Sequence, residues 1–305
     1  MNTTIHILLA FGTPPLILSV IAKTKALFAG RVGPPLLQPY WDLLKLFQKD
    51  SVFSTTTSWV FRAGPVISLV TAGLAGLMIP LADSSAPISF LGDAILLAYL
   101  LGLGRFFTAI AAMDTGSSFE GMGAAREMTF ACLAEPAFFL GLLVLAKLSG
   151  SLTLVAMLSR SGGQTIFTSE PTAGACLALV LLSWFVVLLA ENARIPFDDP
   201  NTHLELTMVH EVMVLDHGGP VLGMILYSTV LKLFVFASLV VRLAIPLGTG
   251  SVWLDWPLYL AGMTACAVII GIVESTVARL RLTHVPLLLV AACLLSVFSV
   301  LLLVR

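Results

Sequence analysis

The sequence predicts an all-α polytopic membrane protein with about eight transmembrane helices and one amphipathic helix on the cytoplasmic side. Of its 305 residues, 58% are hydrophobic and 11% are charged, whereas a soluble domain carries about 25% charged residues. The mean hydropathy is +1.01. A surface in contact with water cannot be built from so few charges, so lipid is the predicted solvent. The net charge of −1 gives no indication of a nucleic-acid partner.

A helix that spans the hydrocarbon core needs about 20 mostly apolar residues. The stretches that meet this requirement are, in chain order, 4–22, 65–82, 90–113, 128–149, 173–192, 221–244, 253–274 and 285–304. The first stretch has no basic residue ahead of its apolar run, so it differs from a secretory signal and is expected to stay as a spanning helix. We find no internal repeat, which predicts a single membrane domain over residues 1–305.

The distribution of Lys and Arg predicts the orientation of these helices. The loops after odd-numbered helices contain Lys23, Lys25, Arg31, Lys45, Lys49, Arg62, Arg126, Arg194, Arg279 and Arg281. The opposite side contains Lys147, Arg160, Arg242 and Arg305. Because cytoplasmic loops are rich in basic residues, we expect a multi-pass protein of the cell's inner (cytoplasmic) membrane, with large loops in the cytoplasm and both termini outside.

The cytoplasmic side is predicted to carry more structure than the outer side. Within residues 23–64, the stretch from Pro39 to Lys49 has the pattern of an amphipathic helix. Its apolar face is expected to contain Tyr40, Trp41, Leu43, Leu44 and Phe47, and its polar face Asp42, Lys45 and Lys49. Such a helix would lie in the membrane plane or dock on a partner. The loops 113–127 and 193–220 are rich in Asp, Glu, His and Gly, which suggests a docking platform.

Several charged residues fall inside the predicted spans, where a charge costs roughly 2.5–3.5 kcal/mol on insertion scales. Lys232 lies roughly 17 Å into its helix, taking about 1.5 Å per residue, so it cannot easily reach water. The other charges are Asp93, Arg105, Glu135, Glu191 and Glu274. If these side chains face inward, they form either a proton path or a set of structural ion pairs; near the interface, simple hydration competes with both interpretations.

The stretch from 191 to 220 is the richest in titratable groups. His203, His210 and His217 recur every seven residues. In a continuous helix they would share one face and lie about 10.5 Å apart, which is too far to share one metal ion. The zinc motif H-E-x-x-H is also not matched, so no metal site is predicted. A stripe of His, Asp and Glu would either transfer protons at the membrane surface or contact a partner subunit.

The cysteines give no sign of a cofactor. Cys132, Cys176, Cys266 and Cys293 each stand alone in an apolar stretch, without a C-x-x-C pair. This pattern argues against a cysteine-bound metal, an iron–sulfur cluster or a disulfide framework. We therefore expect buried cysteines that act as small hydrophobic residues, and a chain that binds no redox cofactor itself.

Four motifs resemble one known family, and they extend from residue 31 to residue 282. ENARIPFD at 191–198 and RVGPPLLQPYWDLLK at 31–45 resemble motifs of the complex I heel subunit (subunit 1) and its hydrogenase relatives. GRFFTAIAAMDTGSSFEGMGAAREMTFACLAEP at 104–136 and ESTVARLRL at 274–282 are similar to the formate-hydrogenlyase branch of membrane-bound hydrogenase subunits. Asn201 and His203 stand where the family usually has glutamates.

The resemblance implies a subunit that anchors a hydrogenase-like peripheral arm on its cytoplasmic face and couples redox chemistry to ion movement. Its implied partners are a hydrogenase-like large subunit, an iron–sulfur small subunit and antiporter-like membrane subunits. Those partners, and not this chain, would carry iron–sulfur clusters and, where present, nickel–iron. We expect a proton path through Arg105, Glu135, Glu191 and Lys232. The expected arm interface and acid/His loop comprise Asp114, Arg126, Glu127, Arg194, Asp198, Asp199, His203, Glu205, His210, Glu211 and Asp216.

Three other functions are consistent with parts of this pattern. The chain would be the quinone-site subunit of a true complex I if the purified complex reduced quinone. It would be a passive anchor if its membrane charges served assembly alone. It would be an independent secondary transporter if it transported alone in liposomes, although we find neither an inverted repeat nor paired broken helices, which transporters often have.

Overall fold

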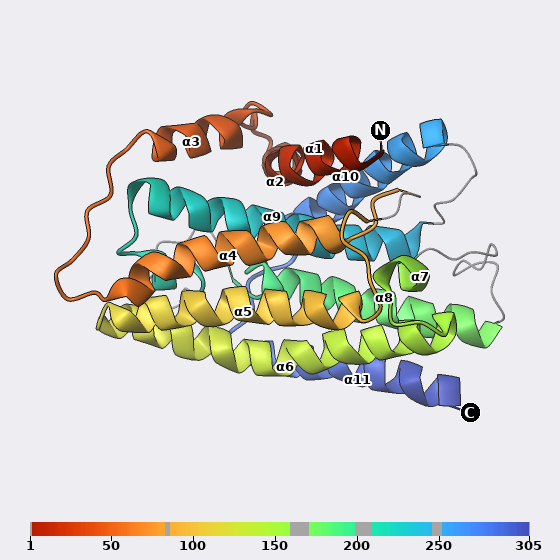
Figure 1. Ribbon diagram of the computed structural model, residues 1–305. Coiled ribbons are helices and arrows are strands. Elements are labelled where there is room, and N and C mark those ends of the chain that lie inside the picture. The colour runs from red at the N-terminus through yellow and green to blue at the C-terminus, as the bar shows by residue number, and fades with distance from the viewer. Residues whose placement is uncertain (1, 83–85, 159–170, 199–208, 246–251, 305) are drawn as a thin grey trace.

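The structure, a computed structural model, is a bundle of roughly parallel long helices (Figure 1). It describes residues 2–82, 86–158, 171–198, 209–245 and 252–304. Every regular element in these ranges is helical. Among these residues, seven helices are long and apolar enough to cross a membrane, and the number rises to eight if a bent pair of helices at the N-terminus counts as one span. The predicted fold class, an all-α polytopic membrane protein, is therefore confirmed.

The seven long helices are α4 (Trp59–Met78), α5 (Asp93–Asp114), α6 (Ser118–Ser149), α8 (Pro171–Glu191), α9 (Gly219–Ala244), α10 (Val252–Thr276) and α11 (Val285–Val304). Five of them agree with the predicted spans to within three residues at each end, whereas α4 is shifted toward the N-terminus and α6 begins earlier than predicted. Of the most apolar 18-residue stretch of α9, 72% is buried inside the bundle, whereas the corresponding share of α11 is 22%. The sixth predicted span is thus the central helix of the bundle, and the last one lies at its edge.

The first predicted span is two helices and not one. α1 (Asn2–Gly12) and α2 (Pro14–Phe28) meet at Thr13 and are bent by 43°. Pro14 and Pro15 open α2, where a missing N–H does no harm, but they end the hydrogen-bond ladder of α1. The freed carbonyl of Phe11 accepts a hydrogen bond of 2.7 Å from the Tyr227 hydroxyl, and that of Gly12 accepts one from Tyr40. Side chains of neighbouring helices therefore satisfy the break, as a membrane interior requires.

The predicted amphipathic helix is present as α3 (Gln38–Phe47), but its apolar residues do not share one environment. Trp41 and Leu44 are more than half exposed, whereas Leu43 and Leu46 line a cavity between α3 and the bundle. The predicted amphipathic helix is therefore confirmed, and only part of its apolar face packs against the bundle. Tyr40 instead anchors α3 to the break between α1 and α2.

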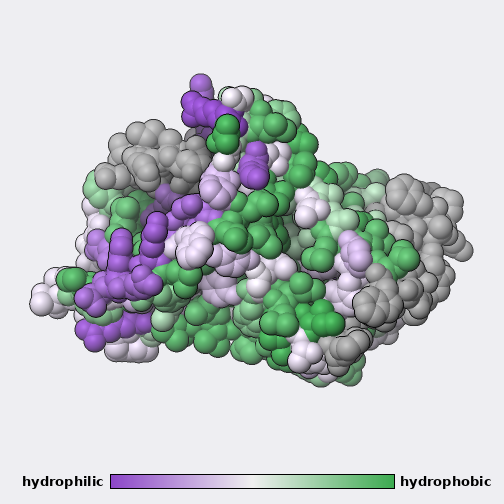
Figure 2. Space-filling view, turned by 90° about the horizontal axis from the view of Figure 1, so that it is seen from above, coloured by the Kyte–Doolittle hydropathy of each residue, from purple (hydrophilic) through white to green (hydrophobic). Residues whose placement is uncertain are grey.

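The predicted loop 113–127 is mostly helix. α6 begins at Ser118, ten residues before the predicted span, and this extension packs against the short 3-10 helix η1 (Glu211–Val214). The extension therefore carries Arg126 and Glu127 on a helix next to the 209–214 segment. Figure 2 shows hydrophilic side chains gathered at the end of the bundle where α3 lies, and a largely hydrophobic surface beyond it.

Candidate functional site

The structure brings the four predicted proton-path residues together. Arg105 of α5 and Glu191 at the end of α8 form an ion pair, and a second oxygen contact of Arg105, at 2.7 Å, is to Glu135 of α6. Lys232 of α9 lies 2.8 Å from Glu191, measured from Nζ to Oε2. The side chains of Arg105 and Glu191 are 6% and 4% exposed. Four helices thus contribute one buried chain of alternating charges, Lys232–Glu191–Arg105–Glu135, which we call the charge chain.

A second buried ion-pair group lies beside it. The Glu274 side chain of α10 is fully buried and contacts Lys25 of α2 at 2.8 Å and Arg194 at 3.3 Å. The backbones of α2 and α10 approach closely here, since a Cβ added at Gly271 would lie 2.7 Å from the Cβ of Thr24. Sequence reasoning left simple hydration open for Glu274, and burial with two cations removes that interpretation. It also missed Lys25 as a partner, although a buried glutamate in an apolar helix signals that a cation must lie nearby.

Asp198 connects three segments that are distant in sequence. Its Oδ1 accepts a hydrogen bond of 2.8 Å from Arg279, and its Oδ2 accepts bonds from the backbone N–H groups of Val209 (2.9 Å) and His210 (3.3 Å). Sequence reasoning counted Arg279 as an orientation signal alone. The carboxylate therefore fixes the 209–214 segment against the 191–198 loop and the residues that follow α10.

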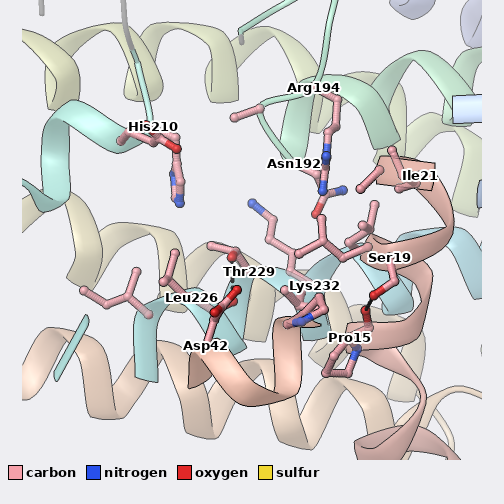
Figure 3. Close-up of a pocket in the computed structure, with 18 of the residues that line it drawn as sticks. Pro15, Ser19, Ile21, Asp42, Asn192, Arg194, His210, Leu226, Thr229 and Lys232 are labelled. Carbon is pink, nitrogen blue, oxygen red and sulfur yellow. Dashed lines mark hydrogen bonds between the residues drawn. The ribbon is translucent and has the colours of Figure 1, made fainter. Parts of the chain in front are cut away.

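A cavity of about 560 Å³ lies between α2, α3, α9 and the 191–198 loop. We call it the large cavity. Leu18, Ile21, Leu43 and Val230 contribute to its apolar walls; its polar lining includes Lys25, Asp42, Glu191, Arg194, Asp198, His210, Glu211 and Lys232. In Figure 3, His210 and Lys232 reach into this space from the 209–214 segment and from α9, and Arg194 lies on the loop above. Lys232 and Glu191 connect the cavity with the charge chain.

The histidines do not share a helical face. η1 is four residues long, and His210 and His217 lie on either side of it, so the condition under which they would share a face, a continuous helix, is not met in residues 209–217. His203 lies outside them. His210 lines the large cavity, whereas His217 is buried and stacks on Phe61 with a centroid distance of 3.9 Å. Burial lowers the pKa of both imidazoles.

Most of the predicted arm-interface residues that the structure describes point inward. Arg194 and Asp198 form the ion pairs given above, Glu127 lies 3.9 Å from Arg105, and Glu211 lines the large cavity. Asp114 and Arg126 are half-buried, and Asp216 is exposed. The other predicted interface residues, Asp199, His203 and Glu205, lie outside the described residues. The expected surface platform is therefore largely an internal polar network in this chain.

Two carboxylates of this region hold the backbone in place. Asp114 accepts a hydrogen bond of 2.7 Å from the backbone N–H of Ser58, which precedes α4. Glu120, which sequence reasoning missed, is fully buried and accepts one of 3.1 Å from the backbone N–H of Asp216. These contacts close the turns at the α3 end of the bundle, and they assign structural roles to both carboxylates.

The opposite end of the bundle also contains buried charges, and these are structural. Asp93 is fully buried, and its carboxylate accepts a hydrogen bond of 2.6 Å from the backbone N–H of Leu154 at the start of α7 (Leu154–Leu158). Arg242 donates to the carbonyls of Ala82 and Leu158. Asp93 is thus a cap for α7, and it belongs neither to the charge chain nor to a hydrated surface.

The described residues contain no group of three His, Cys, Asp or Glu side chains that could hold a metal ion. Cys176 and Cys266 are buried and Cys293 is half-buried. Cys132 is exposed on α6, so the expectation of buried cysteines is wrong for this position.

Comparisons with known proteins identify the family of the chain and its fold. The sequence model of the NADH dehydrogenase family matches residues 2–305. Formate hydrogenlyase subunit 4 of Escherichia coli (strain K12) is 30% identical over 92% of this chain and 91% of the relative. Hydrogenase-4 component C of the same strain is 34% identical over 78% of this chain and 72% of the relative. A chain of the membrane-bound sulfane sulfur reductase, an archaeal respiratory membrane complex, has the same fold, with a TM-score of 0.83, 22% identity and 99% coverage of both chains.

Proposed function

The chain belongs to the NADH dehydrogenase family, and from this premise we propose that it is the membrane-anchor and proton-path subunit of a hydrogenase-like, energy-converting respiratory complex. It is a multi-pass membrane protein, and its relatives are subunits of multi-subunit membrane complexes. The proposed partners are a hydrogenase-like large subunit, an iron–sulfur small subunit and antiporter-like membrane subunits. The redox cofactors would belong to those partners.

The charge chain is the observation that carries this proposal. It begins at Lys232 on the wall of the large cavity and ends at Glu135, whose side chain is 46% exposed on α6. Fixed charges inside a membrane are expensive, and those that remain usually serve ion pathways or pairing between helices. Here the contacts run in one direction, from a cavity at the α3 end to the outer face of α6. In a path of this form the carboxylates Glu191 and Glu135 would carry the proton toward a neighbouring subunit, and Arg105, whose guanidinium keeps its protons, would hold them in place.

The chemistry of the path would depend on the charge of the carboxylates. Glu191 contacts both Lys232 and Arg105, so its protonation would remove the attraction that holds the two cations. The 191–198 loop also carries Arg194 and Asp198, which are fixed by Glu274 and Arg279. A redox change in an arm docked beside this loop would shift the local potential, and with it the proton occupancy of Glu191.

The orientation in the proposal follows the Lys and Arg bias. The hydrophilic end of the bundle would face the cytoplasm of the cell and receive the peripheral arm, and both termini would lie outside the inner membrane.

Purification from native membranes in mild detergent, followed by mass spectrometry, tests the partners. A bound large subunit, iron–sulfur subunit and antiporter-like subunits would support the proposal, and a stable chain that purifies alone would contradict it.

Glu135→Gln tests the path itself. The amide keeps the shape of the side chain but removes its charge and its ability to release a proton. In liposomes that contain the purified complex, with reduced methyl viologen as electron donor, we expect proton uptake per electron to fall at least tenfold, while electron transfer stays within twofold. Lys147→Gln is the matched control, because Lys147 is exposed at the other end of the same helix. Unchanged uptake in Glu135→Gln would contradict the path.

The large cavity favours a second candidate function, that of the quinone-site subunit of a true complex I. It combines apolar walls with a polar end that contains His210 and Lys232, as a pocket for an apolar ligand with a polar head does. Reduction of decylubiquinone by the purified complex would establish this function, and its absence would leave the hydrogenase-like assignment.

A passive anchor would instead lose assembly, and not proton uptake, when Lys232 is neutralised.

A further inference from the structure

A second, much smaller cavity adjoins the large cavity at His210. Its volume is about 40 Å³, and its lining contains Arg105, Glu127, His210 and Lys232 together with hydroxyl groups of Thr71, Thr108 and Ser228. We call it the small cavity. His210, Lys232 and Thr229 line both cavities. His210 therefore stands between the open space at the α3 end and the buried charge chain.

Two buried nitrogens in the lining of the small cavity have no hydrogen-bond partner among the described residues: Arg105 Nε and His210 Nε2. The carboxylate oxygen Glu127 Oε1 lies 3.9 Å from Arg105 Nε, which is too far for a direct hydrogen bond. Buried polar atoms without a partner are rare in native proteins, and an ordered water often satisfies them. A polar cavity needs about 10–15 Å³ to hold one water, so the small cavity has room for at least one.

We propose that ordered water in the small cavity joins His210 Nε2, Arg105 Nε and the Glu127 carboxylate, and that His210 carries protons across this junction from the large cavity to the charge chain. The proposal rests on the proton-path function given above and adds its entry point. One proton moves in each passage. A hydronium ion of the large cavity protonates Nδ1 of the neutral imidazole and is left as water. The imidazolium then releases its Nε2 proton through the junction water to the Glu127 carboxylate, and exchange of the remaining proton between the two ring nitrogens restores the starting form of His210.

The other groups at the junction are less free to exchange a proton. Glu191 contacts two cations, and Lys232 is held by Glu191 at 2.8 Å. The Asp198 carboxylate accepts a hydrogen bond from the backbone N–H of His210 and so holds this residue in place. Its imidazole ring is positioned without an ion pair of its own in the described part of the chain. The proposal therefore makes Asp198 a positioning residue and His210 the carrier.

The charges around His210 act on its pKa in opposite directions. Burial lowers the pKa of the imidazole, and the ammonium of Lys232 on α9 acts in the same direction. The carboxylates of Glu127 on α6 and Asp198 in the 191–198 loop oppose this shift. Arg105 of α5 also lines the small cavity, and Glu211 follows His210 in the chain and lines the large one. Because the opposing charges lie on different elements, a change at any of them would shift the proton occupancy of His210.

His210→Gln in the whole complex tests the inference, because glutamine keeps a polar side chain of similar reach but cannot carry a proton near neutral pH. In the liposome assay with reduced methyl viologen, we expect proton uptake per electron to fall at least tenfold and to lose its dependence on pH below about 6.5, where an imidazole with a lowered pKa titrates. Assembly of the complex would stay within twofold of the wild type. His284→Gln, at an exposed histidine, is the matched control and would behave as the wild type.

Glu191→Gln, measured in parallel, separates the two levels of the argument. Loss of uptake in both variants supports the junction. Loss in Glu191→Gln alone overturns the role of His210 and leaves the path intact, and loss in neither overturns the path and the junction together. A second variant guards against a merely structural defect: imidazole added to His210→Ala should restore uptake through the large cavity, and failure to restore it in an assembled complex would count against a carrier.

The water itself can be observed without any substitution. A high-resolution cryo-EM map of the wild-type complex should contain density for water within hydrogen-bond distance of both His210 Nε2 and Arg105 Nε. A dry small cavity, or protein atoms on these two nitrogens, would overturn the proposal.

Discussion

At the scale of single residues, the charges of the two ion-pair groups are tolerated because each has a partner of opposite sign on another element. Lys232 has Glu191, Arg105 has Glu135 and Glu191, and Glu274 has two cations. Removing one member of such a group would leave an uncompensated charge in a medium that cannot solvate it, which costs more than the pair contributes. The expectation of ion pairing was therefore sound, and the identity of each partner needed the structure.

The stacked ring of His217 makes a prediction about pH. Burial lowers its pKa below the unfolded value of about 6.5, so the unfolded chain binds the proton more readily than the folded one. The contribution of neutral His217 to the free energy of unfolding is fully present above pH 6.5. It is lost as the pH falls below that value, by at most about 1.4 kcal/mol per pH unit for one group. We expect the thermal midpoint of the purified complex to fall between pH 6.5 and 5.5.

His217→Phe should make this fall smaller, because phenylalanine can keep the stacking on Phe61 and has no proton to bind. Intrinsic fluorescence on heating gives the midpoint at each pH. His284→Phe, at an exposed position, serves as the control and should leave the fall unchanged. Equal falls in wild type and His217→Phe would show that the protonation of His217 does not affect stability.

At the scale of elements, the apolar patterns predicted the spans well and the cytoplasmic-side structure poorly. The last span, 285–304, has the same bounds in the sequence prediction and in α11. The start of α6 was missed because Glu120, Arg126 and Glu127 read as a water-exposed loop, whereas they lie on a helix that packs against η1. The break after α1 was readable in principle, since G-T-P-P is a helix-breaking sequence, but hydropathy alone does not register it.

The contact between α6 and the 209–214 segment depends on Gly123. A Cβ added there would lie 2.2 Å from Val212 Cγ1 and 3.0 Å from the carbonyl oxygen of Val209. Because Val209 and His210 share the Asp198 carboxylate, the backbone has little freedom to retreat. We expect Gly123→Ala to destabilise the chain by about 1–3 kcal/mol, as overpacking does, and to reduce proton uptake by displacing His210.

Gly121 offers a matched control on the same helix, because a Cβ there meets nothing within 4 Å. Gly121→Ala should raise the thermal midpoint slightly, since alanine favours a helix by about 1 kcal/mol over glycine. The two substitutions make the same chemical change two residues apart. Changes of opposite sign in the thermal midpoint would therefore show that the contact with Val212 causes the destabilisation. A midpoint for Gly123→Ala equal to that for Gly121→Ala would mean that the segment yields freely.

At the scale of the whole molecule, the residues of the site could be predicted and their geometry could not. Arg105, Glu135, Glu191 and Lys232 stood out because each is a charge in an apolar stretch. Their assembly depends on helix packing that joins residues 30 and 86 positions apart, and nothing in local sequence encodes such pairings. The two cavities depend on the same packing, together with the placement of α3, so the position of His210 between them had no sequence signal either.

The end of the charge chain leads to a prediction about assembly. Glu135 lies about 21 Å from the end of α6 at Ser149, taking about 1.5 Å per residue, and therefore within a hydrocarbon core about 30 Å thick. Its side chain is nevertheless 46% exposed. A half-exposed carboxylate at this depth is costly against lipid, so we expect a neighbouring membrane subunit to cover this face of α6 and to present a hydrogen-bond donor or a water-lined surface to it.

Phe139 reports on that cover, because it lies one helical turn after Glu135 on the same face and is 41% exposed. With p-benzoylphenylalanine in place of Phe139, illumination of the intact complex should cross-link this chain to another membrane subunit, and mass spectrometry of the adduct would identify the partner and its residue. The same variant stripped of its partners in harsher detergent should give no such adduct. Adducts with lipid or detergent alone in the intact complex would show that the charge chain ends at the bilayer, which would favour a passive role for Glu135 because a proton delivered there would have no acceptor.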